Sequence, residues 1–146
     1  ANSIRREILK MAYEAKSSHT GGCLSCVDLL TVLYFSMLKI NPKNVFDPNR
    51  DRFIFSKAHA SKALYATLSE RGFFPKQKLS TYERDGGLPG HTARNVVPGV
   101  EISAGSLGHG LSIAAGMAYA GSTANTATTI YLKANVSSLT VNLFLF

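Results

Sequence analysis

Acidic side chains are scarce in this sequence. Nine Asp and Glu residues stand against sixteen Lys and Arg residues, which gives a net charge of +7. That balance favours anionic ligands such as phosphates. The basic residues are scattered, with no run of five or more, so we interpret them mainly as a solvated surface and expect no nucleic-acid partner. No Asp or Glu follows Glu101, so the rest of the chain offers no carboxylate to a metal ion.

Cysteine is also rare, and both cysteines lie in one motif, "CLSC", at residues 23 to 26. A redox motif of this kind normally follows a strand, and a zinc site needs a second pair of ligands. We therefore interpret Cys23 and Cys26 as small residues that pack the start of a helix. A thiol redox or metal-binding module stays open as an alternative, because the positive end of a helix can lower a thiol pKa.

Long apolar stretches are missing as well. The apolar runs are too short and too interrupted to span a bilayer, and the N-terminus lacks the apolar core of a signal peptide. We therefore expect no membrane association and a cytoplasmic location. The 146 residues suffice for one domain with a sizeable core.

Hydrophobic periodicity predicts helices that alternate with short strands. A helix is expected over 4–15, capped by Asn2 or Ser3, and a nearly all-apolar run predicts a buried helix over 27–38. Further helices are expected over 61–72, 76–84 and 111–120, and short strands over 52–56 and 100–103. This alternation indicates an α/β fold, with a parallel sheet flanked by helices.

The chain changes character after Gly121. Residues 122–129 are rich in Thr, Ala and Ser, and residues 130–146 predict one or two strands with an apolar, uncharged end. An exposed apolar strand invites aggregation. We therefore expect one domain over 1–120, with 121–146 as a divergent or truncated continuation of it.

The four histidines share one kind of setting. His19, His59, His91 and His109 are all expected in loops or turns, each beside Gly, Ala or Ser. Small neighbours let the backbone approach a ligand, and imidazole can donate, accept or shuttle a proton near neutral pH. Any one of them alone is adequately explained as a surface residue, but four similar settings favour a functional site. Their wide spacing does not favour zinc.

A glycine-rich turn, "GSLGHG" at residues 105 to 110, leads directly into the helix expected over 111–120. Backbone N–H groups in such a turn can face an anion or a polar ring. The turn matches neither the dinucleotide-binding glycine motif nor a P-loop. A tight turn followed by close helix packing explains it equally well.

Several separated motifs together resemble the N-terminal region of transketolases. They are "SSHTGGCLS", "NRDRFIFSKAHASKALYA", "LPGH" and "PGVEISAGSLGHGLSIAAGMAYA", which cover roughly residues 3 to 120. The chain is most similar to the N-terminal subunit of split bacterial transketolases. The resemblance implies a thiamine-diphosphate-binding α/β domain whose active site lies between subunits.

The resemblance also implies roles for matching positions. His19 and His91 would lie over the reactive carbon of thiamine diphosphate, and His59 near its diphosphate and the substrate. Gly105 and Leu107 would offer backbone groups to the aminopyrimidine ring. The reaction would be transfer of a two-carbon ketol unit between phosphorylated sugars, with Mg²⁺ bridging the diphosphate. The partners would be sugar phosphates and a C-terminal transketolase-like subunit or domain, in a homo- or hetero-oligomer.

The sequence departs from the family pattern at several positions. Ser18 and Ala58 replace usual glycines, Thr20 replaces a proline, and His109 stands where a glutamine is usual. The Asp and Asn that hold the family's metal have no counterpart here, because "TTIYLKANVSS" carries no acidic residue. We therefore expect no metal ligand within this chain. The alternative function is a non-catalytic subunit or pseudoenzyme that keeps the fold and lacks the metal site.

Overall fold

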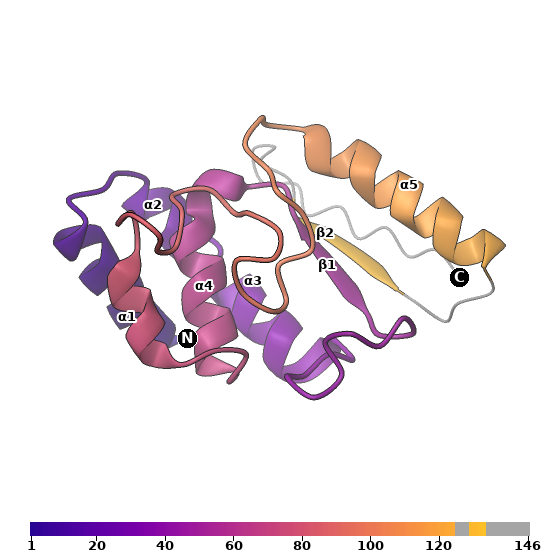
Figure 1. The fold of residues 1–146 in the computed structure, drawn as a ribbon, viewed down its shortest axis with the longest axis horizontal. Helices are drawn as coiled ribbons and strands as arrows, with labels where there is room; N and C mark the ends of the chain where they lie inside the picture. The colour runs from indigo at the N-terminus through magenta and orange to yellow at the C-terminus, as the bar shows by residue number, and fades with distance from the viewer. Residues whose placement is uncertain (125–128, 134–146) are drawn as a thin grey trace.

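The structure is a computed structural model that describes residues 1–124 and 129–133. Helices lie on both sides of a short pair of strands, which run through the middle of the molecule (Figure 1). The larger group of helices, α1 to α4, lies on one side, and the long helix α5 lies on the other. This arrangement confirms the α/β class expected from the sequence.

Helix α1 (Asn2–Glu14) buries one stripe of its surface. Ile4, Ile8 and Met11 recur at helical spacing and are almost fully buried, and the helix packs mainly on α4. The helix expected over 4–15 is therefore confirmed. The expected cap is wrong, because Ala1 is the N-cap residue and no side chain caps it. Asn2 and Ser3 already lie inside the first turn.

The helix expected over 27–38 is confirmed: α3 (Val27–Val32) and the π-helical turn η1 (Leu33–Met37) follow each other without a break. A short helix before it, α2 (Thr20–Leu24), was not expected. By length and composition alone, Thr20–Met37 is apolar enough to cross a membrane, a weak signal that core helices also give. Here Cys23, Val27, Leu30, Leu33 and Tyr34 are buried in the main core. One face of this run therefore packs in the core, whereas Val32, Phe35 and Met37 are about half exposed, so the helix expected to be buried is buried on one side only.

The two strands of the sheet are parallel, as the sequence predicted. Strand β1 (Arg52–Phe55) pairs with β2 (Ile130–Lys133), with Arg52 opposite Ile130. Side chains of β1 alternate between two cores: Phe53 and Phe55 contact the helices α1 to α4, whereas Ile54 contacts α5. The strand expected over 52–56 is confirmed. The predictions for residues 134–146 lie outside the described residues.

The strand expected over 100–103 is absent from the sheet formed by the described residues. This segment makes individual ion pairs and hydrogen bonds instead of the regular backbone hydrogen bonds of a strand. The Glu101 carboxylate pairs with Arg50 and Arg52, and the Ala104 amide donates to the Thr92 carbonyl at 3.0 Å. Its β-branched residues satisfied the strand pattern, but Val100 is buried by side chains of the core rather than by a neighbouring strand.

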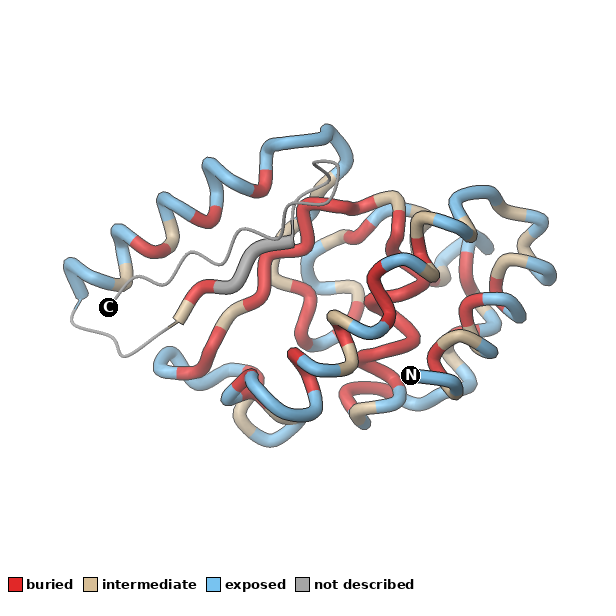
Figure 2. Tube along the Cα trace, turned by 180° about the vertical axis from the view of Figure 1, so that it is seen from behind, coloured by how far each residue is buried: buried red, intermediate tan, exposed pale blue. Residues whose placement is uncertain are grey.

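Helix α4 (Ser61–Glu70) is the centre of the main core (Figure 2). Every residue from Ser61 to Ser69 is buried, which explains why its sequence shows little amphipathic contrast. It is preceded by the 3₁₀ turn η2 (Ala58–Ala60). Gly72 stops the helix, as expected, because its φ of 89° turns the chain away from the helix axis. The turn lets the Phe73 amide donate to the Leu68 carbonyl at 3.0 Å. The helix expected over 76–84 is a shorter 3₁₀ helix, η3 (Lys76–Thr81).

Helix α5 (His109–Thr123) packs against the strands through its small residues. Ala114 and Ala118 meet Ile54 of β1 and Ile130 of β2 in a second, smaller core. At its first turn Gly110 lies so close to Ser56 that a side chain on Gly110 would overlap the Ser56 Cβ and Oγ. The Gly110 amide donates to Ser56 Oγ at 3.1 Å, so this contact fixes the start of α5 beside the end of β1.

Candidate active site

The candidate site lies just beyond the carboxyl end of β1. The strand ends at Phe55, and Ser56 and Lys57 lead into η2, which carries His59. Ligands of parallel α/β sheets bind at this end of the strands. The loops that carry His19 and His91 converge on this same end through contacts with α4.

His19 is held in a left-handed backbone conformation. It is the N-cap residue of α2, with φ 67° and ψ 18°. Buried Lys62 fixes the residues before it: its Nζ donates to Ser17 Oγ at 2.9 Å and to the Ser18 carbonyl at 2.7 Å. Ser18 Oγ lies 2.9 Å from His19 Nδ1. His19 is exposed to solvent, so its imidazole is accessible. The backbone just before it is held by Lys62.

His59 faces His19 directly. The two ring centroids are 5.2 Å apart, with an interplanar angle of 47°. Partial burial lowers the pKa of His59, and the neighbouring charges of His19, Lys57 and His91 lower it further. A histidine in this setting is neutral near pH 7 and can accept a proton.

Glycine at position 22 leaves room beside this pair. A Cβ there would lie 3.7 Å from His59 Cδ2 and Nε2 and 3.7 Å from Lys57 Cε. Lys57 Nζ donates to Ser25 Oγ at 3.0 Å. The ammonium group and the His59 ring therefore both lie beside α2, where they present positive or proton-donating groups to an anion.

His91 is positioned by two side chains of α4. Ser61 Oγ donates to the Gly90 carbonyl at 2.6 Å, and the Tyr65 hydroxyl donates to the His91 carbonyl at 3.3 Å. The charge of His91 reaches His59, since it contributes to the lowered pKa of that ring. The structure thus brings the rings of His19 and His59 into contact and holds the His91 segment against the first two turns of α4, which begin directly after η2.

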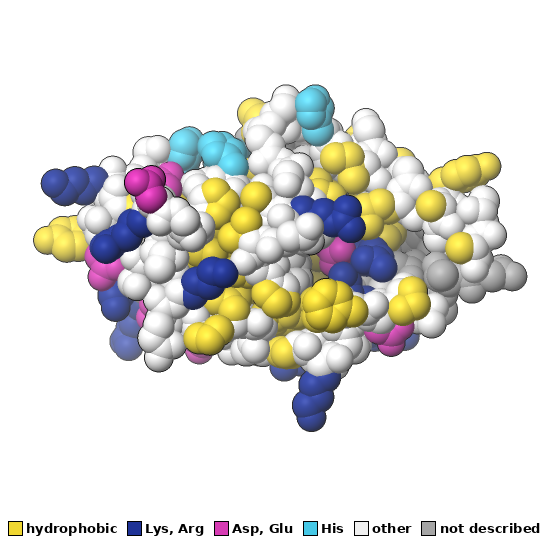
Figure 3. All heavy atoms as spheres, viewed as in Figure 1, with side chains coloured by type: hydrophobic (Ala, Val, Ile, Leu, Met, Phe, Trp, Pro, Cys, Tyr) yellow, Lys and Arg dark blue, Asp and Glu magenta, His cyan; other side chains and the backbone are white. Residues whose placement is uncertain are grey.

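His109 differs from the other three histidines. It is the first residue of α5 and its side chain is exposed. Within the described residues, no ring contact and no charge effect on a pKa joins it to the other histidines. Figure 3 shows histidine side chains along one edge of the viewed face.

The glycine-rich turn before α5 presents open backbone. A Cβ on Gly105 would meet no atom within 4 Å, and Leu107 is 57% exposed. Gly108, the N-cap residue of α5, has φ 91°, which favours glycine. The Ala104 amide ties the start of this turn to Thr92, the residue after His91. Gly105 and Leu107, two of the three expected cofactor-binding residues, therefore lie in a turn that is anchored to the segment of His91.

The cysteine pair lies below the surface. Cys23 is fully buried and Cys26 almost so, and they form no disulfide. Burial raises the pKa of the Cys23 thiol, although Lys62 and Lys57 partly oppose it. A raised pKa and lack of access are the opposite of what a reactive thiol needs. Cys26 Sγ instead lies 3.2 Å from the Cys23 carbonyl, within the helix start.

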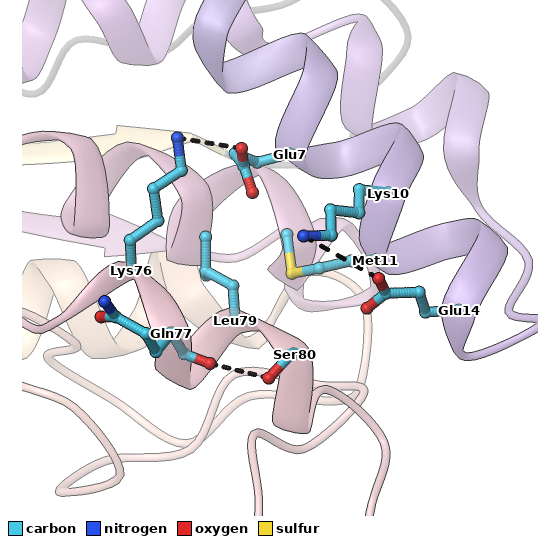
Figure 4. Close-up of a pocket in the computed structure, with 8 residues that line it drawn as sticks. All are labelled: Glu7, Lys10, Met11, Glu14, Lys76, Gln77, Leu79 and Ser80. Carbon is cyan, nitrogen blue, oxygen red and sulfur yellow. Dashed lines mark hydrogen bonds and ion pairs between the residues drawn. The ribbon is translucent and has the colours of Figure 1, made fainter.

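The charges around the pocket between α1 and η3 pair with one another (Figure 4). Lys76 Nζ lies 2.9 Å from Glu7 Oε1, and Lys10 Nζ lies 3.9 Å from Glu14 Oε1. This pocket holds about 360 Å³ and is lined by Glu7, Lys10, Met11, Glu14, Lys76, Gln77, Leu79 and Ser80. Its charges cancel locally, so it offers no evident chemistry.

Two positions where the family usually has glycine carry larger residues here without strain. Neither Ser18 nor Ala58 is among the non-glycine residues with positive φ, which are Lys16, His19, Glu83 and Asn95. Ala58 is fully buried at the start of η2. The departures at these positions therefore leave the local backbone in ordinary conformations.

The fold and the site define an α/β domain that gathers histidines, a lysine and open backbone at the end of a parallel strand. A family model described as "Transketolase, thiamine diphosphate binding domain" matches residues 1–141. The chain belongs to the transketolase family, and the match is to its thiamine-diphosphate-binding domain.

Its relatives include separate subunits of transketolases. The chain is 42% identical over 134 residues to an apulose-4-phosphate transketolase subunit of Actinobacillus succinogenes, a match that covers 90% of this chain and 49% of the relative. It is 42% identical over 132 residues to "6-deoxy-6-sulfo-D-fructose transketolase subunit SqwG" of a Clostridium species, covering 90% and 48%. The chain therefore spans about half the length of these relatives.

Solved transketolases share the fold. The structure superposes on transketolase from Campylobacter jejuni with a TM-score of 0.83 and 36% identity, covering 90% of this chain and 22% of that chain. For transketolase from Leishmania mexicana the TM-score is 0.82 at 28% identity, covering 90% and 21%. Both comparisons support the α/β architecture seen here.

The residues present fit an anionic, ring-bearing cofactor in part. Lys57 and His59 suit a diphosphate, and the exposed backbone of Gly105 and Leu107 suits a polar ring. A metal is a different matter: among residues 1–124 and 129–133, no three His, Cys, Asp or Glu side chains lie close enough to hold one ion.

Sequence reasoning found the histidines but missed their supports. Lys62, Ser61 and Tyr65 all lie in the first two turns of α4 and hold the two histidine loops. Lys62 could have been recognised from the sequence, because a lysine within a largely apolar helix is buried only when its ammonium group has hydrogen-bond acceptors. Ser56 was also missed, since only the packed structure shows it against Gly110.

Proposed function

We propose that this chain supplies half of a thiamine-diphosphate-dependent site that transfers a two-carbon ketol unit between phosphorylated sugars. The convergence of His19, His59 and His91 at the end of β1 carries this proposal. Three proton-transferring groups in one place suit a reaction in which hydroxyl protons move as carbon–carbon bonds form and break.

Each histidine has a separate task in this proposal. His59, neutral because of its lowered pKa, accepts a proton from a sugar hydroxyl. His19 and His91, both exposed, donate hydrogen bonds to substrate oxygens and stabilise developing alkoxides. Lys57 offsets the negative charge of a phosphate group.

Thiamine diphosphate, when bound, supplies the carbanion chemistry that no side chain provides. Gly105 and Leu107 would orient its aminopyrimidine ring through their backbone groups, and His59 would contact its diphosphate. Mg²⁺ would be coordinated by ligands outside the described residues of this chain.

A partner completes the site in this proposal. The chain matches only about half the length of the relatives that are themselves transketolase subunits. The site would therefore also need the counterpart of the part of these relatives that the chain does not span, together with a C-terminal transketolase-like subunit or domain. We expect the isolated chain with added thiamine diphosphate and Mg²⁺ to show no ketol transfer. Robust turnover by the isolated chain would mean that the site is complete within it.

The test is a ketol-transfer assay on the full assembly. His91→Ala and His19→Ala should each lower kcat by about 10²-fold or more, as expected for the loss of a group that stabilises a developing alkoxide, while the melting temperature stays close to that of the wild type. Cys23→Ser serves as the matched control at a buried, non-catalytic position and should leave kcat nearly unchanged. Equal loss of activity in all three variants would remove the assigned roles.

A further inference from the structure

A second pocket lies near the opposite end of β1. It holds about 420 Å³ and is lined by residues of two loops, 45–52 and 94–101: Val45, Phe46, Arg50, Arg52, Arg94, Asn95, Val97, Pro98, Gly99, Val100 and Glu101. Arg52 begins β1, whereas the histidines follow its last residue. The strand therefore separates the two places by about 10 Å or more.

One arginine of this pocket is fully engaged. Arg50 is buried, its Nε donates to the Val45 carbonyl at 2.6 Å, and one guanidinium nitrogen donates to the Asp51 carbonyl at 3.0 Å. The same nitrogen pairs with the Glu101 carboxylate, which is 5% exposed. This buried pair neutralises the acidic residue of the pocket lining.

Two other arginines give the pocket its net positive charge. Arg52 makes a single ion pair, 3.2 Å from Nη1 to Glu101 Oε2, and its side chain is 27% exposed. Arg94 is exposed and has no acidic partner among residues 1–124 and 129–133. With Arg50 and Glu101 cancelling, the lining keeps the charge of two guanidinium groups, which suit a phosphate through their planar pairs of donors.

The rim of the pocket is apolar. Phe46 is 92% exposed, and Pro98 is an exposed apolar residue on the opposite loop. Figure 3 shows basic side chains gathered around an acidic one on the viewed face, next to exposed apolar side chains. An exposed aromatic ring beside a cationic pocket can pack on the body of a ligand whose charged group enters the pocket.

We propose that this pocket binds a phosphorylated small molecule. Arg52 and Arg94 receive the phosphate, and Phe46 packs on the organic body. The site is independent of the histidine site, and its ligand is a phosphate monoester with an apolar or ring-shaped body.

The test is calorimetric titration of the full chain with two probes, inorganic phosphate and phenyl phosphate. Phenyl phosphate should bind more tightly, because only it meets Phe46. Arg52→Gln and Arg94→Gln should each weaken both probes by about tenfold, as expected for the loss of one charge-assisted hydrogen bond. Phe46→Ala should weaken phenyl phosphate and leave inorganic phosphate unchanged.

Two control variants separate binding in this pocket from unspecific attraction and from binding at the histidine site. Arg6→Gln removes an arginine of α1, far from the pocket lining, and should not change either affinity. His59→Gln, at the histidine site, should not change them either. The proposal is overturned if Arg6→Gln matches Arg94→Gln, which would indicate unspecific attraction to a basic chain, or if His59→Gln abolishes binding. Absence of phenyl phosphate binding to the wild type would overturn it as well.

Folding does not confound the result. Arg52→Gln removes an ion pair and can destabilise the chain, so its melting temperature is measured in parallel. Arg94 and Phe46 are exposed and belong to no described ion pair, so their substitution tests the pocket without that complication. If both exposed variants bind the probes like the wild type, the proposal is wrong whatever Arg52→Gln does.

Discussion

The ammonium group of Lys62 donates to the carbonyl of Ser18 at 2.7 Å, one residue before His19. The same group donates to Ser17 Oγ and lies 5.0 Å from the centroid of the Tyr82 ring. A buried lysine in the first turn of α4 therefore anchors the segment that carries a proposed catalytic histidine. Its charge is stabilised by oxygen acceptors and an aromatic face, which a buried ammonium requires.

Removal of this charge should loosen the His19 segment alone. In Lys62→Met, we expect amide exchange at Cys23, whose N–H donates to the His19 carbonyl, to become about tenfold faster, because a hydrogen bond from a charged group contributes about 1.5 kcal/mol. Amides of α1 at Ile8 and Met11 should stay protected. Hydrogen exchange measured by mass spectrometry checks this. Lys10→Met, at an exposed lysine, is the control, and identical exchange at Cys23 in both variants would show that Lys62 has no anchoring role.

Two glycines of α5 should respond in opposite ways to alanine. Gly110→Ala places a Cβ against the Cβ and Oγ of Ser56 and should lower the free energy of unfolding by about 1–3 kcal/mol. The overlap can be relieved only by a shift of the backbone at one of the two residues. Gly116→Ala meets no atom within 4 Å and should stabilise it by about 0.5–1 kcal/mol through helix propensity. Urea unfolding measures both. A similar free energy of unfolding for the two variants would mean that α5 does not pack on Ser56.

Stability should fall on acidification partly through His59. Its folded-state pKa lies below the ordinary value of 6.5, so the unfolded chain binds the proton more readily. The resulting stability is present above pH 6.5 and is lost as the pH falls through the folded-state pKa. The free energy of unfolding should therefore decrease less steeply below pH 6.5 in His59→Gln than in the wild type. Parallel pH profiles for the two proteins would contradict this.

The cysteines should be inert until the chain unfolds. Burial raises the pKa of Cys23 and excludes reagents from both thiols. An aromatic disulfide reagent should label them slowly in buffer and rapidly in denaturant. The absorbance of the aromatic thiolate that the reagent releases measures the rate of labelling. Stoichiometric labelling in the native state within seconds would revive the redox interpretation of "CLSC".

The sequence was sufficient for features that depend on local patterns. The stripe of Ile4, Ile8 and Met11 and the stop at Gly72 follow from spacing and backbone freedom. The segment around Val100 did not follow, because its β-branched residues fit a core as well as a strand, and the choice depends on a distant partner. The short helix α2 was likewise missed, because its residues 20–24 include two glycines, which favour a loop in a single sequence.

The site divides in the same way. Histidines beside small residues identified His19, His59 and His91 as candidates, but their meeting depends on α4, whose polar residues were interpreted only as part of a helix. The charges of Arg50, Arg52 and Glu101 are adjacent only after loops 45–52 and 94–101 fold together. Contacts between segments about fifty residues apart leave no periodic trace in a single sequence.

The left-handed backbone of His19 has a consequence for how this protein changes over generations. At φ 67°, histidine costs about 1 kcal/mol or more relative to glycine, so mutation towards Gly or Asn would stabilise the fold. A chain released from catalysis would drift in that direction, because nothing would oppose the gain. Under the catalytic role proposed for His19, a histidine retained at this position would reflect selection for its ring, and its replacement in a descendant would mark the loss of that role before the fold itself decays.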